Sequence, residues 1–168
     1  FDRKNDFVNY YANDGLQGNE FSKDAALRDK NGKLYFAGIS GITGFYPAEI
    51  RSVEKKLDIR ITDFYVHDKP VKKGDKSGSY DIINSSVMDA ETFQLSHEDN
   101  SFGIEFSAME FKNPERITYV YRINDGNWIS LHPGISRVSY SNLAPGEYCF
   151  TVKAVDYNSV SEEKEIVI

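Results

Sequence analysis

The sequence predicts an all-β protein, and three observations carry this prediction. Apolar residues alternate with polar ones in several stretches of the 168-residue chain, as in strands that bury one face. Aromatic residues make up 14% of the chain, with 11 Tyr and 11 Phe, and such side chains favour strands. Helical spacing is best developed over the short stretch from Pro47 to Lys56, which we interpret as a connector or a single helical turn.

Residues 1–56 predict one blade of a β-propeller. Four short strands are expected, at Phe7 to Tyr11, Phe21 to Arg28, Leu34 to Gly38 and Ile42 to Tyr46. Tight turns separate them, among them Asn31-Gly32, a pair that readily adopts the positive φ angles of a hairpin turn. Four antiparallel strands of this kind form a blade, and a lone blade cannot bury both of its faces. We therefore expect this segment to belong to a larger propeller.

Residues 57–168 predict an immunoglobulin- or fibronectin type III-like β-sandwich. Strands are expected at residues 59–66, 93–95, 102–108, 117–123, 128–131, 137–140, 148–154 and 165–168. The polar stretch from His67 to Ser79 reads as a loop. About seven short strands with turn residues between them are typical of this sandwich.

Five aromatic residues form the structural signature of the predicted sandwich: Tyr119, Tyr121, Trp128, Tyr140 and Tyr148. Alternation places Tyr119 and Tyr121 on the inward face of one strand. Tyr148 ends the motif Leu-x-Pro-Gly-x-Tyr of a tyrosine corner, in which the hydroxyl bonds back to the backbone a few residues upstream. Trp128 is interpreted as a core residue, because the equivalent strand commonly buries an aromatic ring. Tyr140 precedes the corner.

No catalytic, metal-binding or cofactor-binding residues are predicted. His67, His97 and His132 lie in turn-like contexts, and the sequence has no G-x-S-x-G nucleophile motif. The run His97-Glu98-Asp99 is a weak metal candidate, because neighbouring side chains rarely converge on one ion. The candidates for an exposed aromatic platform that binds sugars are Trp128, Tyr10, Tyr11, Tyr35 and Tyr46, and the core interpretation is favoured for Trp128 and Tyr35.

Charge, cysteine content and the length of apolar runs argue against nucleic-acid binding, a disulfide within the chain and a membrane span. The net charge is -6 and the sequence has no basic stripe, so nucleic-acid binding is not expected. The single cysteine, Cys149, cannot form a disulfide within the chain. No apolar run approaches the roughly 20 residues that span a bilayer.

Motifs in both predicted parts of the chain resemble known families. Asp14-Gly15-Leu16, Asp29-Lys30-Asn31-Gly32-Lys33-Leu34-Tyr35-Phe36-Ala37-Gly38 and Phe45-Tyr46-Pro47 resemble the two-component regulator propeller repeat. Asn100 to Phe106, Tyr119-Val120-Tyr121-Arg122, Trp128 and Leu143 to Tyr148 resemble the Y_Y_Y domain that follows such propellers. The turn Asn124 to Asn127 is shorter than the family's, and Ser159-Val160 stands where the family tends to carry Gly and Trp. Both departures are expected in loops.

The resemblance implies a periplasmic sensor region of a Bacteroidetes hybrid two-component sensor histidine kinase. Such a segment is not an enzyme itself, and it relays the state of a glycan ligand from the propeller to a membrane helix just C-terminal to it. The resemblance also implies a homodimer, and an oligosaccharide bound mainly by propeller parts outside residues 1–168. The alternative is a fibronectin-like accessory or carbohydrate-binding module of a secreted glycan-active protein.

Overall fold

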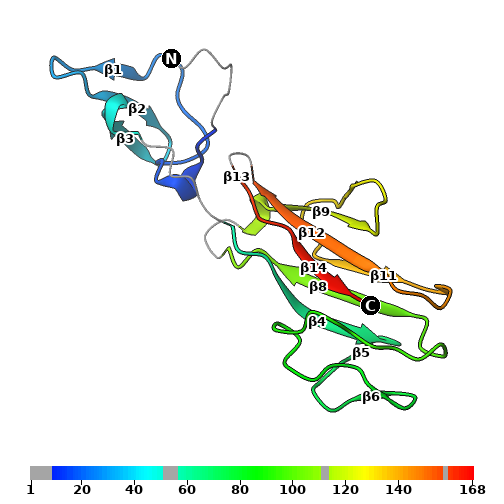
Figure 1. The fold of residues 1–168 in the computed structure, drawn as a ribbon. Helices are drawn as coiled ribbons and strands as arrows, with labels where there is room; N and C mark the ends of the chain where they lie inside the picture. The colour runs from blue at the N-terminus through cyan, green and yellow to red at the C-terminus, as the bar shows by residue number, and fades with distance from the viewer. Residues whose placement is uncertain (1–8, 51–56, 111–113, 157–158) are drawn as a thin grey trace. The chain divides into compact units, whose positions relative to one another are not determined.

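The computed structural model describes residues 9–50, 57–110, 114–156 and 159–168. The chain divides into two compact units, Phe1–Glu54 and Lys55–Ile168. Helical structure in the described residues is limited to three 3-10 turns, η1 (Ala12–Asp14), η2 (Pro47–Glu49) and η3 (Pro114–Arg116), and all paired strands are antiparallel (Figure 1). The predicted all-β fold class is confirmed.

The first unit contains one antiparallel sheet. Its strands are β1 (Ala26–Arg28), β2 (Leu34–Gly38) and β3 (Gly41–Phe45), in the order β1-β2-β3. Phe36 on β2 packs between Phe21 and Phe45, with ring centroids 6.2 and 5.9 Å away. None of the described residues of this unit is buried. The described strands of this unit therefore enclose no core by themselves.

Two of the expected strands of the first unit differ in the structure. The strand predicted from Phe21 begins only at Ala26, because Asp24 has a φ of 61° and the Ala25 amide bonds to Ser22 O across a turn. Residues 9–11 are not a strand but lead into η1, while residues 7–8 lie outside the described part. The helical spacing after Pro47 yields only η2, and residues 51–56 also lie outside it.

The second unit is built from two sheets and a small hairpin (Figure 1). The first sheet has the order β11-β8-β4-β5, with β4 (Arg60–Val66), β5 (Lys69–Pro70), β8 (Phe102–Ser107) and β11 (Arg137–Tyr140). The second has the order β10-β9-β12-β13, and β14 also pairs with β12. Its strands are β9 (Thr118–Ile123), β10 (Ile129–Ser130), β12 (Cys149–Asp156), β13 (Ser159–Val160) and β14 (Lys164–Val167). The hairpin is β6 (Lys76–Ser77) and β7 (Tyr80–Asp81).

The core lies between the two sheets, where each strand presents every second residue. Phe106 of β8 is 1% exposed, and its ring centroid lies 5.0 Å from Tyr119 and 6.1 Å from Phe150 of the other sheet. Phe64 of β4 stacks on Phe93 at 4.2 Å. Alternating apolar residues therefore build one core shared by both sheets, which is the sandwich arrangement expected from the sequence.

Most differences between the predicted and the observed strands of the second unit concern short strands. The stretch His67 to Ser79 was expected as a loop, yet it contains β5 and β6. His67 and Asp68 have φ angles of 47° and 61° and form the two-residue turn between β4 and β5. Ser159-Val160 was also expected in a loop, but it forms β13 against the end of β12.

The segment expected as a strand at residues 93–95 is irregular. Thr92 forms an isolated bridge with Val167, and the Phe93 amide donates to Val167 O at 2.8 Å. The Val167 amide in turn donates to Glu91 O at 2.8 Å. This segment therefore covers the free edge of β14.

Candidate functional site

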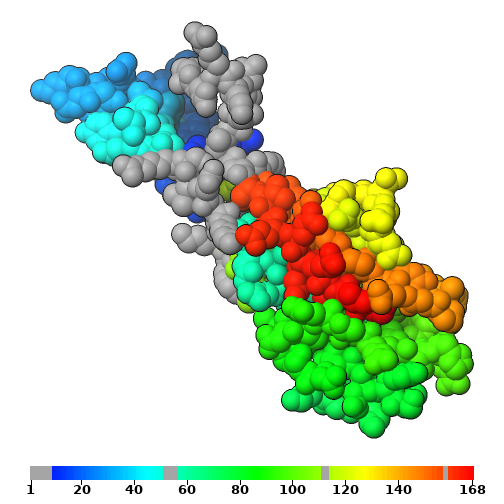
Figure 2. Space-filling view, in the orientation of Figure 1, coloured from blue at the N-terminus to red at the C-terminus, as the bar shows by residue number. Residues whose placement is uncertain are grey.

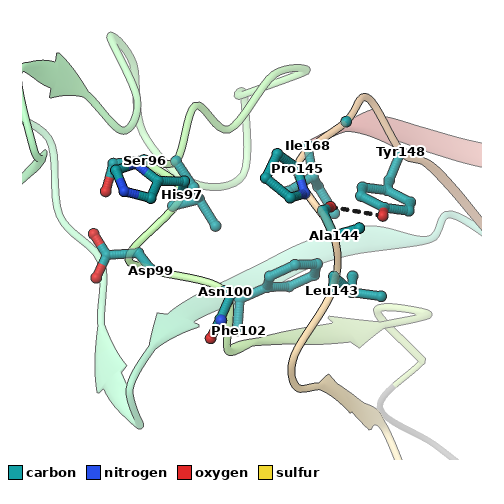
Figure 3. Close-up of a pocket in the computed structure, with 12 residues that line it drawn as sticks. Ser96, His97, Asp99, Asn100, Phe102, Leu143, Ala144, Pro145, Tyr148 and Ile168 are labelled. Carbon is teal, nitrogen blue, oxygen red and sulfur yellow. Dashed lines mark hydrogen bonds between the residues drawn. The ribbon is translucent and has the colours of Figure 1, made fainter.

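Tyr148 forms a tyrosine corner at the end of the second unit. Its hydroxyl donates a hydrogen bond of 2.8 Å to the carbonyl oxygen of Ala144, four residues upstream (Figure 3). Pro145 and Gly146 lie between the two residues, and a Cβ on Gly146 would be 3.9 Å from the ring. The bond fixes the loop that enters β12.

The same tyrosine holds the C-terminal residue of the chain. The Tyr148 amide donates to Ile168 O at 2.9 Å, and the Ile168 amide donates to Tyr148 O at 2.9 Å. The side chain of Ile166 on β14 is 1% exposed and belongs to the core. Because the 91–93 segment pairs with the other edge of β14, the C-terminal strand is held on both sides.

A pocket of about 120 Å³ lies beside the corner (Figure 3). Its lining consists of residues from the 95–102 segment, the corner and the C-terminus: Leu95, Ser96, His97, Asp99, Asn100, Phe102, Leu143, Ala144, Pro145, Gly146, Tyr148 and Ile168. Pockets for drug-sized ligands have volumes of about 300–1,000 Å³. This pocket is therefore too small to enclose an oligosaccharide.

Removal of the corner hydroxyl is expected to destabilise the second unit. We expect Tyr148→Phe to lower its free energy of unfolding by about 0.5–1.5 kcal/mol, because one hydrogen bond to the Ala144 carbonyl is lost. Thermal unfolding followed by Trp fluorescence would measure the loss. Tyr80→Phe, at a 46% exposed tyrosine on β7, serves as the control and should leave the midpoint unchanged. Equal midpoints for all three proteins would contradict the assignment.

Tyr119 and Tyr121 lie on the inward side of β9. Tyr119 is 8% exposed, and its hydroxyl accepts a hydrogen bond of 3.1 Å from the buried amide of Ala108. Tyr121 is half-buried, and its ring stacks on Phe150 with centroids 5.8 Å apart. Both rings pack in the core, and one hydroxyl also satisfies a backbone donor.

Tyr140 on β11 packs against Phe102 with ring centroids 5.5 Å apart. Its hydroxyl oxygen is enclosed and has no hydrogen-bond partner among the described residues. Burial, together with the nearby Tyr121 hydroxyl, raises the pKa of Tyr140 well above its usual range. Tyr140 therefore contributes packing to the core, and its hydroxyl forms no hydrogen bond to the described part of the chain.

Trp128 is not in the core, and the sequence interpretation was wrong on this point. The side chain is 37% exposed at the end of the β9–β10 turn. The guanidinium of Arg122 lies 4.7 Å and the ammonium of Lys153 lies 4.1 Å from its ring centroid. Trp128 therefore lies over the outer face of the β9–β12 pair, because two cations on that face attract its ring.

A carboxylate completes this cluster. Glu163 lies 2.8 Å from the Lys153 ammonium and 3.5 Å from the Arg122 guanidinium. The hydrogen bond from Lys153, aided by the charges of Lys153 and Arg122, holds the pKa of Glu163 below its usual range. Alternation along β9 and β12 predicts the outer face for both cations. Their meeting with Trp128 and Glu163 depends on strand register, which the sequence does not state.

The exposed position of Trp128 predicts a small effect on stability. We expect Trp128→Ala to lower the free energy of unfolding by about 1–2 kcal/mol, since two partly exposed cation–π contacts contribute about 0.5–1 kcal/mol each. Trp128→Phe should lose less. Urea unfolding followed by circular dichroism would measure both. A loss of 3–5 kcal/mol, as for a buried Trp, would contradict the observed position.

The histidines do not form a nucleophilic site. Asp99 accepts a hydrogen bond from Ser77 Oγ and lies 2.9 Å from His67 Nε2. The Asp99 carboxylate therefore lies between the Ser77 hydroxyl and the His67 imidazole. A Ser-His-Asp triad needs the imidazole next to the hydroxyl. Ser77 is also fully buried, and its Oγ accepts from the Ser96 amide at 2.6 Å. This network fastens the β6–β7 hairpin to the 96–99 turn.

His97 and His132 are exposed. Within the described ranges, no group of three His, Cys, Asp or Glu side chains is arranged to hold a metal ion. A search of the same residues for helices long and apolar enough to cross a membrane finds none.

The two antiparallel sheets, their shared core and the tyrosine corner define an immunoglobulin-like β-sandwich. Residues 110–168, which contain β9 to β14, match the family model of the Y_Y_Y domain. The match confirms the resemblance of these C-terminal residues to the Y_Y_Y domain. The propeller repeat expected in residues 1–56 stays a prediction.

Similar proteins come from two-component signalling. Histidine kinase P4 of Formosa agariphila is 24% identical over 159 residues, which cover 95% of this chain and 11% of the relative. The extracellular domain of the putative hybrid two component system BT3049 from B. thetaiotaomicron is 23% identical with a TM-score of 0.69, over 95% of this chain and 21% of that one. The extracellular domain of the putative hybrid two component system BT4673 from the same organism is 21% identical with a TM-score of 0.59, over 85% and 19%.

The coverage values show how much of each relative this chain resembles. The chain spans about a tenth of the length of the curated relative and about a fifth of the solved chains. The solved structures share the fold of this chain over most of its length. The chain is thus similar to one segment of much longer proteins.

Proposed function

We propose that the chain is the extracytoplasmic relay segment of a hybrid two-component sensor histidine kinase. It passes the state of a glycan ligand from a propeller to a membrane helix that follows Ile168. The observation that carries the proposal is the likeness over 95% of the chain to the extracellular domain of a putative hybrid two component system. The segment itself performs no catalysis, and the kinase belongs to the parent protein.

The architecture of each unit supports this role. The first unit leaves Leu27, Ile39 and Ile42 64%, 84% and 70% exposed, as expected of a blade whose neighbours are further propeller blades. In the second unit, the C-terminal strand is hydrogen-bonded on both edges, so a displacement of the sandwich moves Ile168 with it. We place the segment in the periplasm, ahead of an inner-membrane anchor, and expect it to work as a homodimer.

The ligand is proposed to bind mainly to propeller parts outside this chain. The pocket of about 120 Å³ at the corner is too small for an oligosaccharide, and we assign it no ligand.

The relay proposal is tested in the parent protein. A reporter gene under control of the full-length sensor should respond to its inducing glycan. The native Cys149 lies opposite Val167 in the β12–β14 register, so Val167→Cys can link the two strands by a disulfide. If the sandwich moves as one body, the oxidised variant should keep the response. Loss of the response on oxidation, and its return on reduction, would instead indicate that β14 detaches during signalling.

The exposed ring of Trp128 favours a second candidate, a carbohydrate-binding module of a secreted glycan-active protein. Titration calorimetry of the chain with oligosaccharides separates the two functions. Saturable binding that Trp128→Ala abolishes would support the module. Absence of heat with glycans that activate the full-length sensor would support the relay.

A further inference from the structure

Positive charge gathers on the segment from Lys69 to Asp81 in the second unit. Four exposed lysines lie within it, although the net charge of the chain is -6: Lys69, Lys72, Lys73 and Lys76. Asp75 accepts the backbone amide of Lys72 at 2.8 Å, and Asp81 lies 3.8 Å from the ammonium of Lys76. Lys69, Lys72 and Lys73 form no ion pair with the residues that the structure describes. These three ammonium groups can therefore meet an external anion.

Buried residues fix the orientation of this segment. Val71, Ser77 and Ile82 are 5%, 0% and 4% exposed, and they lie between or beside the lysines in the sequence. The Val71 amide donates to Phe64 O at 2.8 Å. The Ile82 amide donates to Asp75 O at 3.0 Å. The inner side of the segment is thus held against the sandwich, and the lysines remain on its outer side.

An exposed tyrosine lies beside the lysines. Tyr80 on β7 is 46% exposed and is paired with Ser77 on β6, next to Lys76. Tyrosine rings are enriched at the level of lipid headgroups, and lysines near a membrane surface are attracted to anionic lipids. A surface with both residue types fits a membrane interface better than it fits a soluble anion. We call the set Lys69, Lys72, Lys73, Lys76 and Tyr80 the lysine hairpin.

The lysine hairpin belongs to the end of the sandwich that holds Ile168. Asp99 accepts a hydrogen bond from Ser77 Oγ and lies 2.9 Å from His67 Nε2, so it ties down the residues on either side of the lysines. Asp99 and Ile168 line the same pocket beside the tyrosine corner. β6 and the C-terminus lie on the same side of the second unit (Figure 1). In the space-filling view, the red C-terminal segment borders on the green region of the 95–102 segment (Figure 2).

We propose that the lysine hairpin docks on a membrane surface that carries anionic phospholipids. The inference rests on the proposed function, in which a membrane helix follows Ile168 and brings this end of the sandwich close to the bilayer. Each lysine near an anionic surface strengthens binding about fivefold, so four lysines give a dissociation constant of about 1 mM. A short linker holds a tethered module at a millimolar effective concentration, so a contact of this strength suffices once the helix is in the membrane.

Docking sets the angle at which the sandwich stands on the membrane. Asp99 links the hairpin to the corner end, where Tyr148 bonds both the amide and the carbonyl of Ile168. A hairpin held on the lipid surface therefore restrains the strand that leads out of the sandwich. The contact gives the relay a second point on the membrane besides its helix.

Vesicle binding of the 168-residue chain tests the contact. Co-sedimentation with vesicles of phosphatidylcholine mixed with phosphatidylglycerol should give a dissociation constant of about 1 mM in lipid. Vesicles of phosphatidylcholine alone should bind at least about tenfold more weakly. Added salt should release the chain from the anionic vesicles, because salt screens exposed charges. Equal binding to both kinds of vesicle, or none to the anionic ones at several times that lipid concentration, would overturn the proposal.

Matched lysine substitutions locate the contact. Lys72→Gln combined with Lys73→Gln should raise the dissociation constant about 25-fold, because two lysines are lost. Lys23→Gln combined with Lys30→Gln removes the same charge at exposed positions of the first unit and should leave the affinity unchanged. Circular dichroism should show that both double variants are folded. An equal loss in both variants, or no loss in the first, would rule out docking through the hairpin.

A fluorescent reporter on the hairpin gives an independent measurement. Tyr80→Trp in a Trp128→Phe background leaves a single Trp, on β7. Its emission should move to shorter wavelength with anionic vesicles, because the ring enters the headgroup region. Ile135→Trp in the same background is the control, at a 47% exposed site next to Ser136, which bonds Phe106 toward the other end of β8. A shift at both positions, or at neither, would contradict the proposed contact.

These outcomes separate the membrane contact from the relay. A chain that ignores anionic vesicles while its full-length parent still answers its glycan overturns the contact alone. A parent without a membrane helix after Ile168 overturns the relay, whatever the vesicles show.

Discussion

Phe106→Ala is expected to lower the free energy of unfolding of the sandwich by about 3–5 kcal/mol. Phe106 is 1% exposed on β8, and its ring contacts Tyr119 and Phe150 across the space between the two sheets. Truncation leaves a cavity at the point where the two sheets share their core. The loss is a large part of the 5–15 kcal/mol that stabilises a typical domain.

Urea unfolding followed by fluorescence measures this effect in the sandwich alone, because Trp128 is the single Trp of the chain and lies in the second unit. Ile135→Ala, at a 47% exposed position of the same unit, is the control and should change the free energy by less than about 0.5 kcal/mol. Phe106→Leu keeps a measurable protein if the alanine variant does not fold. A loss below about 1 kcal/mol for Phe106→Ala would contradict a core shared by both sheets.

The sequence predicted the long strands well because their signal is local. The alternation at residues 102–108 and 117–123 specifies which side chains face inward, and β8 and β9 place Phe106 and Tyr119 there. The tyrosine corner is also local, since its hydrogen bond spans only four residues. Such features need no knowledge of which strands pair.

Short strands and cross-strand contacts escaped prediction for the opposite reason. A strand of two residues, such as β5 or β13, is too short to show an alternation of inward and outward residues. Such a strand forms only where another strand lies beside it, and local sequence does not state which strands are neighbours. The position of Trp128 depends on the register that brings Arg122 and Lys153 together on the outer face. The equivalent strand of such sandwiches commonly buries an aromatic ring, but Trp128 lies against two cations and is 37% exposed.

Two hydroxyl deletions on facing sheets of the sandwich should have opposite effects. Tyr119→Phe is expected to lower the free energy of unfolding by about 1–3 kcal/mol, because the amide of Ala108, which is 3% exposed, loses its acceptor. Tyr140→Phe is expected to leave the free energy unchanged or raise it, because the enclosed hydroxyl of Tyr140 has no partner among the described residues. Each change removes one oxygen from a core ring, so each serves as the control for the other.

Alkaline pH adds a second measurement for Tyr140. Burial raises the pKa of Tyr140 in the folded chain above its unfolded value near 10, so the folded state keeps a proton that the unfolded state releases. Folding stability is therefore lost as the pH rises above about 10, by up to about 1.4 kcal/mol per pH unit for this one proton. Urea unfolding of Tyr140→Phe between pH 9 and about pH 11 should show a shallower decline than the native chain. Equal slopes would show that the Tyr140 hydroxyl is open to water in solution. A Tyr140→Phe variant that is less stable than Tyr119→Phe at neutral pH would show that this hydroxyl is bonded.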